Sequence, residues 1–404
     1  MTDTTTDMVA GQITPSPGTN RWWAWVVAVI GLVVLVAISI ASLVPQAVVA
    51  EKENQRLMEV QEAPFSRVPA SAESVNDRVV FGPLPDDVER FETDADFFFV
   101  TVSAPEQSLL SWFAGRGDPA IELLTTEDKF GFRTPQQRTE ANLQSMRTAV
   151  QEAQFVALSA AGYEPEISLG EVIVDEMLCR TRAEDGSCTE FFPSDEAIDP
   201  LDKILFAEGV EMTSVEDLSA VLADKSPGDT AELIIDRPGV GELTVSVELS
   251  ASPDDPTRTI VGFVPFDTRA ITLPFEVSID TGRIGGPSAG LAFTLALIDE
   301  LTEGELTGGA NIAVTGTINL DGSVGPIGGL TQKVNAVLQH DVEVFLVPAS
   351  QFEFREPGEG EPDLRQQLDD AGHGDVEIIP VATLDDALDA LVRLGGDPLV
   401  PVNS

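Results

Sequence analysis

The first pattern along the chain is an uninterrupted apolar segment near its N-terminus. Residues 22–44 contain no charged side chain and consist mostly of Val, Ile, Ala and Leu. A helix of that length, at about 1.5 Å per residue, would span roughly 34 Å, enough to cross the hydrocarbon core of a bilayer. Trp22, Trp23 and Trp25 would lie at one membrane interface, beside Arg21. The pattern therefore predicts a transmembrane helix over residues 22–44.

A cleaved signal peptide is the alternative interpretation of this segment, because residues 48–50 could serve as a cleavage site. The apolar run is longer than a signal peptide needs, and a single basic residue precedes it, so an uncleaved anchor is favoured. The few basic residues on the two sides say little about orientation. A short N-terminus in the cytoplasm is the commoner arrangement. We therefore expect residues 1–21 inside the cell and residues 45–404 outside the cytoplasmic membrane.

The chain between this anchor and residue 165 changes from polar to periodic. Residues 45–76 are polar and rich in Pro, Ser and Ala, which predicts a stalk. The run Phe97–Val102 is apolar and β-rich, which predicts a buried strand. Between residues 136 and 161, apolar side chains recur at three- and four-residue steps, as is typical of an amphipathic helix. We expect residues 77–165 to be an N-terminal part that packs with a later domain.

Residues 166–252 show the order strand, loop, strand, helix, strand, hairpin, strand. Ser214 can cap the helix together with Asp217. The order resembles the late half of a PDZ domain, although Leu201-Asp202 stands where Gly-Asp is usual. The segment from Cys179 to Cys188 occupies the stretch where a loop that binds a peptide carboxylate is expected. The pattern predicts a PDZ-like module in which a peptide could still add to the sheet edge; a purely structural α+β module is the alternative.

Charge is the most unusual feature of the composition. The chain has 68 acidic and 23 basic residues, for a formal net charge of -45. A surface this negative repels phosphate backbones, which argues against nucleic-acid binding. A solvated surface, such as one adapted to a saline habitat, explains the acidity most simply. Selection for basic substrates is the other interpretation, and no local feature supports it.

Cys179 and Cys188 are the only cysteines, and a polar loop with a Gly separates them. In an oxidising compartment they could form a disulfide, although two reduced thiols remain the alternative. The only histidines, His340 and His373, are distant in the sequence. We therefore expect no metal site and no other cofactor.

Residues 253–395 alternate short apolar strands with Gly-rich turns and helices, which predicts an α+β domain followed by a tail at 396–404. Residues 285–290 read Gly-Gly-Pro-Ser-Ala-Gly and continue into an apolar helix. Pro287 suits the first turn of that helix, which would place Ser288 at its N-terminal end. Unpaired backbone N–H groups there can hold an oxyanion. Because Ser is also a common helix cap, this motif alone leaves both roles open.

Lysine is scarce, with five residues in the chain, and Lys333 stands in an unusual place. It follows Gly325-Pro326-Ile327-Gly328-Gly329 and begins a largely apolar helix. Desolvation and the helix dipole would both lower its pKa, and a neutral amine can act as a general base. A surface lysine at a helix start is the alternative, which the scarcity of lysine disfavours.

Together these segments resemble the Lon protease family, specifically its membrane-anchored, PDZ-containing bacterial members. The motif Gly-Pro-Ser-Ala-Gly is intact at 286–290, and Pro-Ile-Gly-Gly-x-x-x-Lys is intact at 326–333. Between them, Val314–Ile318 matches the Thr-Gly strand of the family. The resemblance implies that Ser288 is the nucleophile, that Lys333 is the base, and that Thr315 supports this base. It also implies a backbone oxyanion site formed by Gly286, Pro287 and Ala289. It also implies that residues 77–165 are the front of the same domain.

No Gly-x4-Gly-Lys-Ser/Thr phosphate loop occurs in the sequence, so hydrolysis is expected not to depend on ATP. A Ser–His–Asp triad is disfavoured because His340 and His373 lie in no motif, and Asp280 is at most a minor contributor. The sequence thus predicts a serine endopeptidase that acts on unfolded or membrane-associated proteins, and assembly into a homo-oligomeric ring stays open. The alternative is a catalytically silent, membrane-tethered PDZ scaffold.

Overall fold

The computed structural model describes residues 21–54, 59–131, 134–168, 170–182, 188–252, 258–268, 270–338, 340, 342, 344–353 and 376–402. Its largest unit is built on a six-stranded sheet in the order β24-β23-β20-β5-β3-β6. The strands are β3 (Phe65–Ser74), β5 (Phe97–Ser103), β6 (Glu122–Leu124), β20 (Ile312–Val314), β23 (Val344–Pro348) and β24 (Glu377–Val381). The first four in sheet order are parallel, and β3 and β6 are antiparallel to their neighbours. The predicted α+β class is confirmed as a mixed α/β architecture.

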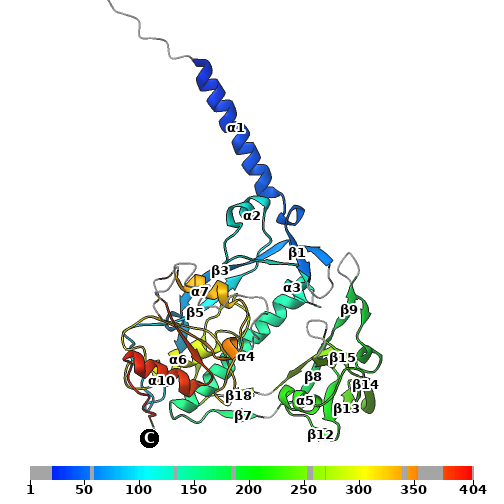
Figure 1. Ribbon diagram of the computed structural model, residues 1–404. Helices are drawn as coiled ribbons and strands as arrows, with labels where there is room; N and C mark the ends of the chain where they lie inside the picture. Colours follow the sequence, from blue (N-terminus) through cyan, green and yellow to red (C-terminus); the bar gives the residue numbers. More distant parts are fainter. Residues whose placement is uncertain are drawn as a thin grey trace, which may run out of the picture.

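Helices cover both faces of this sheet (Figure 1). They are α4 (Pro135–Ala160), α6 (Gly290–Leu301), α7 (Leu330–Leu338) and α10 (Leu384–Leu394). Because successive strand residues point to opposite faces, Phe97 and Phe99 pack in one core with α4, α6 and α10. Val100 and Ala313 pack in a second core with α7. The ends of α6 and α7 therefore approach β5 and β20 from opposite sides of the sheet.

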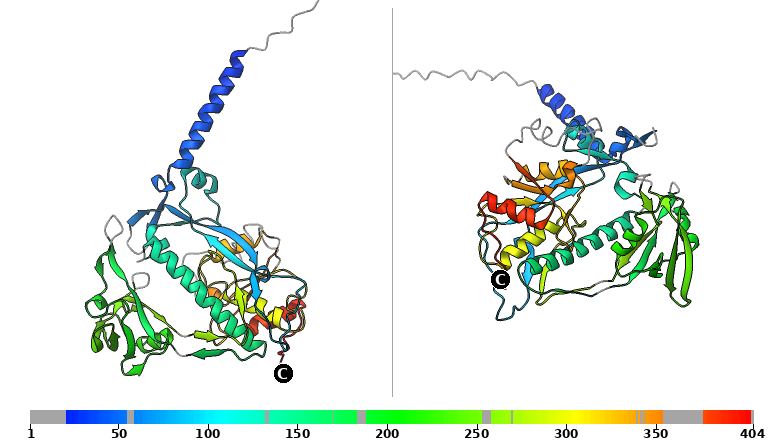
Figure 2. Two further views of the ribbon diagram at one scale, coloured as in Figure 1. Left: turned by 180° about the vertical axis from the view of Figure 1, so that it is seen from behind. Right: turned by 60° about the horizontal axis from the view of Figure 1, so that its bottom comes forward.

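A second unit is inserted in the chain between α4 and α6, and it lies beside α4 in Figures 1 and 2. Its antiparallel sheet has the order β14-β13-β11-β8-β17 and is accompanied by α5 (Val215–Leu222). The strands are β8 (Val172–Met177), β11 (Lys203–Ala207), β13 (Thr230–Arg237), β14 (Gly241–Glu248) and β17 (Phe263–Asp267). Its entry and exit segments pair with each other as β7 (Glu166–Ser168) and β18 (Ala270–Thr272).

The C-terminal limit of this unit differs from the sequence prediction. The prediction ended the unit at residue 252 and gave the following strand to the next domain. Instead β17 pairs with β8 from Phe263 to Asp267, and Phe263 belongs to the core of the second unit. The two paired strands are nearly a hundred residues apart in the sequence. Such a distant pairing leaves no local signal, so the sequence pattern did not reveal it.

The two cysteines lie on a hairpin of the second unit. Its strands are β9 (Cys179–Arg182) and β10 (Cys188–Phe191), which pair antiparallel. A disulfide joins Cys179 and Cys188. The disulfide thus links the first residue of β9 to the first residue of β10.

The helix α1 (Arg21–Leu43) projects away from the rest of the chain (Figure 1). Of the described residues, only Trp22–Leu43 forms a helix long and apolar enough to cross a membrane, and its most apolar part is not buried by other segments. A membrane span and a signal sequence both have this character.

The prediction of a stalk over residues 45–76 is wrong for much of that segment. β3 lies inside the main sheet, between β5 and β6. Gln46, directly after α1, is fully buried, and its side-chain amide donates hydrogen bonds to the carbonyls of Ala63 (2.8 Å) and Phe65 (2.9 Å). The N–H of Leu109, the first residue of α2 (Leu109–Gly115), donates to the carbonyl of Val44 at 2.7 Å. The segment after α1 is therefore a joint that hydrogen bonds hold to the folded chain.

Candidate active site

Ser288 lies in a tight turn directly before α6. The helix begins at Gly290, three residues later than the Pro287 start that the sequence predicts. Gly286 has a φ of +94°, a conformation that side chains other than glycine rarely adopt, and its N–H donates to the carbonyl of Asn142 at 2.7 Å. At Gly290, an added Cβ would lie 2.9 Å from the backbone nitrogen of Ile318. The glycines thus let the turn pass close to α4 and β21 (Thr317–Ile318).

The carbonyl of Ser288 fixes the turn to the end of β20. It accepts hydrogen bonds from the Thr315 hydroxyl (3.1 Å) and from the Gly316 N–H (2.9 Å). In return, the Leu291 N–H donates to the carbonyl of Gly316 at 3.1 Å. The sequence predicts one strand over this region, but β20 ends at Val314 and β21 begins after Gly316. The break brings the Thr315 side chain to Ser288.

Lys333 approaches the same point from α7. Its side chain is buried, with 2% of the residue exposed. The amine contacts three oxygens: Ser288 Oγ at 2.8 Å, Thr315 Oγ1 at 2.9 Å and the carbonyl of Val100 at 2.9 Å. No carboxylate is among these contacts. Burial lowers the pKa of Lys333 to about 7, so that a large share of the amine is neutral near neutral pH.

The hydrogen-bond polarity of this cluster follows from its acceptors. Thr315 uses its hydroxyl hydrogen on the Ser288 carbonyl, so its oxygen must accept from Lys333. The carbonyl of Val100 can only accept. A neutral Lys333 amine spends both of its hydrogens on these two partners, and its lone pair then faces Ser288 Oγ. That geometry favours transfer of the serine proton to the lysine.

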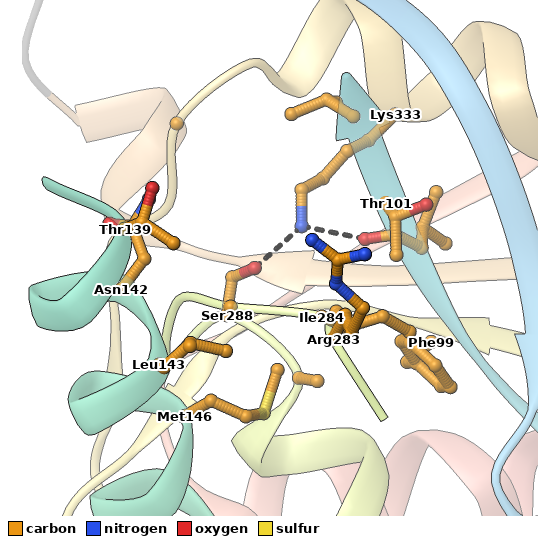
Figure 3. A pocket seen from close by; sticks show the side chains of 15 residues that line it. Phe99, Thr101, Thr139, Asn142, Leu143, Met146, Arg283, Ile284, Ser288 and Lys333 are labelled. Carbon is orange, nitrogen blue, oxygen red and sulfur yellow. Dashed lines mark hydrogen bonds between the residues drawn. The ribbon is translucent and has the colours of Figure 1, made fainter. Parts of the chain in front are cut away.

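Ser288 and Lys333 border a cavity of about 390 Å³ (Figure 3). Its walls come from β5, α4, the turn before α6 and the loop before α7. Its apolar lining includes the large side chains of Phe99, Leu143, Met146 and Ile284. The space is of the size that small ligands or a short peptide segment occupy.

The backbone donors beside Ser288 differ from the predicted oxyanion set. Pro287 has no N–H, and the N–H of Gly286 already donates to Asn142. Of the three predicted residues only Ala289 keeps an available N–H. Across the described part of the chain, no carbonyl accepts a hydrogen bond from the N–H of Ala289 or of Ser288 itself. These two amides are the donors that this turn offers.

The remaining candidates lie elsewhere. His340 follows α7, is exposed and does not line the cavity. His373 lies outside the described residues. Asp280 is exposed, and its carboxylate accepts the N–H of Gly282 at 3.0 Å, so it takes no part in the cluster.

Three contributors to the site were missed from the sequence. Val100 and Asn142 act through backbone carbonyls, which every residue carries, so their side chains give no signal. Arg283 lines the cavity through its side chain. A basic residue five positions before Ser288, in so acidic a chain, was a signal that could have been used.

Solved structures offer a weak comparison for part of the chain. The PDZ domain of the SdrC-like protein from Listeria monocytogenes is 16% identical and matches over 25% of this chain and 92% of its own length. The TM-score is 0.20, which supports no conclusion about the fold.

Sequence relatives are Lon proteases. That of Azospirillum brasilense is 39% identical over 174 residues, which are 39% of this chain and 20% of the relative. That of Roseiflexus castenholzii is 29% identical over 161 residues, which are 37% of this chain and 19% of the relative. The chain thus spans about a fifth of the length of these proteins.

The matching family covers the second half of the site-bearing unit. Residues 277–393 match the Lon protease (S16) C-terminal proteolytic domain, and this range contains Ser288, Thr315 and Lys333. The buried amine and the serine hydroxyl that it contacts both lie within the matched segment, whereas β5 and α4 supply cavity walls from outside it. Residues 277–393 are therefore similar to the proteolytic domain of Lon (S16) proteases, and the matched range includes the three clustered side chains.

Proposed function

We propose that this protein is a membrane-anchored, ATP-independent serine endopeptidase that cleaves unfolded or membrane-associated proteins outside the cytoplasmic membrane. The observation that carries the proposal is the 2.8 Å contact between Ser288 Oγ and the buried Lys333 amine. A hydroxyl is a weak nucleophile, and a neighbouring base with a pKa near the working pH activates it.

The reaction begins when neutral Lys333 takes the proton of Ser288 as Oγ attacks a peptide carbonyl. The N–H groups of Ser288 and Ala289 bind the oxyanion that forms. Lys333 then gives its proton to the leaving amine as the C–N bond breaks, which leaves an acyl-enzyme. Water attacks the ester and gives a proton to Lys333. Return of that proton to Ser288 Oγ releases the acid and restores the site.

Thr315 and Val100 orient the base in this scheme. Their oxygens accept the two hydrogens of the neutral amine, so the lone pair is kept on the side of Ser288. When the amine becomes an ammonium, the same two acceptors stabilise its charge. Neither residue reacts with the substrate, so both are positioning residues.

Cleavage of an unfolded protein without nucleotide tests the activity. The full-length protein in detergent micelles is incubated with casein, with and without ATP, beside the Ser288→Ala variant. We expect fragments from the unsubstituted protein alone, at a rate that ATP leaves unchanged. Cleavage that requires ATP, or that persists in Ser288→Ala, would contradict the proposal. Casein binding without cleavage would instead favour the silent scaffold.

The second unit is proposed to be a PDZ-like module that binds substrate segments. β17 is the last strand of its sheet, so within the described residues its outer edge has no partner strand. α5 lies next to that strand, since Asp267 at the end of β17 accepts the N–H of Val215 at 3.1 Å. An extended peptide can add to such an edge by main-chain hydrogen bonds.

Anchoring by α1 is a further part of the proposal and has its own test. We expect the full-length protein to stay in membranes after alkaline washing, because a span of this length and hydropathy does not leave the bilayer. Protease added to spheroplasts should digest its C-terminal part. Recovery of a soluble protein that begins near residue 51 would show a cleaved signal peptide, and a protected C-terminus would reverse the orientation.

A further inference from the structure

Arg283 is the feature of the cavity that the proposed chemistry does not use. It lies on the loop that leads from β19 (Val277–Ile279) to Ser288. Its side chain lines the cavity and projects into it beside Ile284 (Figure 3). No step of acyl transfer needs a permanent positive charge at this place. The proposed chemistry therefore gives the guanidinium no role, and another one has to be sought.

The side chains that line the cavity carry positive charge and no negative charge. The lining holds two ionisable side chains, Arg283 and Lys333, and no carboxylate. Because burial lowers the pKa of Lys333 to about 7, its amine is only partly charged near pH 7, whereas a guanidinium stays charged. Arg283 consequently supplies a standing positive charge beside the reacting serine.

Several other arginines of the described chain are paired with carboxylates. Arg67 contacts Glu122 at 2.6 Å, and Arg90 and Arg237 contact two buried acids at 2.7 and 2.6 Å. No acidic residue of the described chain forms an ion pair with Arg283, although the sequence has 68 of them. A guanidinium left without a carboxylate in so acidic a protein is available to a carboxylate from outside.

We propose that Arg283 binds a carboxylate of the substrate next to the scissile bond, so that cleavage favours sites flanked by Asp or Glu. The inference rests on the proposed peptidase function and names its substrate class. A guanidinium fork matches a carboxylate with two parallel hydrogen bonds, which an amide cannot do equally well. The apolar walls formed by Phe99, Leu143 and Met146 hold neighbouring residues, and they leave the acid to Arg283.

Two sources could supply the carboxylate: an Asp or Glu side chain, or the free C-terminus of a peptide. Both have the same chemistry, and they differ in where the cut falls. If an Asp or Glu side chain is the ligand, the substrate chain continues past Arg283. If the free C-terminus is the ligand, the substrate chain ends there. Peptides with a free or an amidated C-terminus separate the two cases.

The test uses fluorogenic octapeptides with a central Leu flanked by Asp, Asn or Lys, each with a free and an amidated C-terminus. For the full-length protein we expect kcat/KM to be about tenfold or more higher for Asp than for Asn, and lowest for Lys. The preference should weaken as salt is added, because exposed charges are screened. In Arg283→Gln the difference between Asp and Asn should disappear, and in Arg283→Glu the order should reverse towards Lys.

Arg147→Gln is the matched control. Arg147 lies one residue after Met146 on α4, is exposed, bonds to Gln144 and does not line the cavity. It removes the same charge from the same region and should leave the preference intact. An Asp preference that survives in Arg283→Gln overturns the inference, as does one that is lost equally in Arg147→Gln.

Peptide binding to Ser288→Ala, measured by fluorescence anisotropy, separates this inference from the peptidase proposal. Tighter binding of Asp than Asn peptides, lost on adding Arg283→Gln, supports the carboxylate site even if no cleavage occurs. Equal binding of Asp and Asn peptides refutes the site, even if the unsubstituted protein cleaves casein. A preference that depends on a free C-terminus assigns the carboxylate to the chain end.

Discussion

Replacing Lys333 with arginine is expected to lower kcat by about 10²- to 10⁴-fold, the range that a general base contributes. Arginine keeps a positive charge but cannot give up its proton near neutral pH, so it cannot take the proton of Ser288. It also carries a fork of donors into a site whose two fixed acceptors, Thr315 and Val100, fit a single amine. Casein cleavage by the purified variant, with circular dichroism to check folding, gives the measurement.

The pH profile of the unsubstituted protein supplies the control for this result. Because burial lowers the pKa of Lys333 to about 7, kcat/KM should rise with pH and level off above about 8. The rise reports loss of a proton from the amine, so it should be missing from any residual activity of the arginine variant. Substantial cleavage by that variant, or activity that depends on His340 or His373 instead, would show that Lys333 is not the base.

Replacing Asp299 with asparagine is expected to stabilise the protein, and increasingly so at higher pH. Asp299 is fully buried near the C-terminal end of α6; its Oδ1 accepts the Leu306 N–H at 2.8 Å, while Oδ2 has no hydrogen-bond partner among the described residues. Burial raises the pKa of this carboxyl to about 7. An unfolded chain ionises it near pH 4, so the folded state loses stability as pH rises from about 4 to 7.

The size of the effect follows from the two pKa values. Above pH 7 the loss reaches an upper limit on the order of 4 kcal/mol, and the asparagine variant, which does not ionise, avoids it. Thermal unfolding of both proteins at pH 4.5, 6 and 8 should show a gap in Tm that grows with pH. Asp389→Asn, which removes an exposed carboxylate from α10, is the control and should give no such trend. Parallel curves for Asp299→Asn would refute the burial argument.

The two side chains that meet at the cavity could be singled out from the sequence because each stands in a short motif with characteristic glycines and neighbours. Ser288 and Lys333 are 45 residues apart, but each motif can be recognised by itself. The start of α6 could not be predicted, because the Ser288 carbonyl bonds to Thr315 and Gly316 and so does not begin the helix. That bond depends on a strand end, which a local pattern does not reveal.

The stalk prediction failed for a physical reason that can be located. Pro69 and the polar residues around it are typical of a loop, yet they lie in β3. The pairing of β3 with β5 is irregular between Pro69 and Ala72, and a proline is tolerated at such a break in the ladder. Composition alone does not distinguish an irregular strand from a linker.

The hydrogen-bonded joint after α1 has a consequence for where cleavage can occur. Val44 and Gln46 are held by hydrogen bonds to the folded chain, so with α1 in a bilayer, as proposed, the cavity stays at one height above the lipid. A substrate anchored in the membrane must span the distance from the bilayer to the cavity with an extended segment, at about 3.3 Å per residue. Cuts in such substrates would begin at a fixed number of residues from the bilayer, whereas soluble chains would show no such limit. The anchor and the joint would together set the distance between the membrane and the cleavage site.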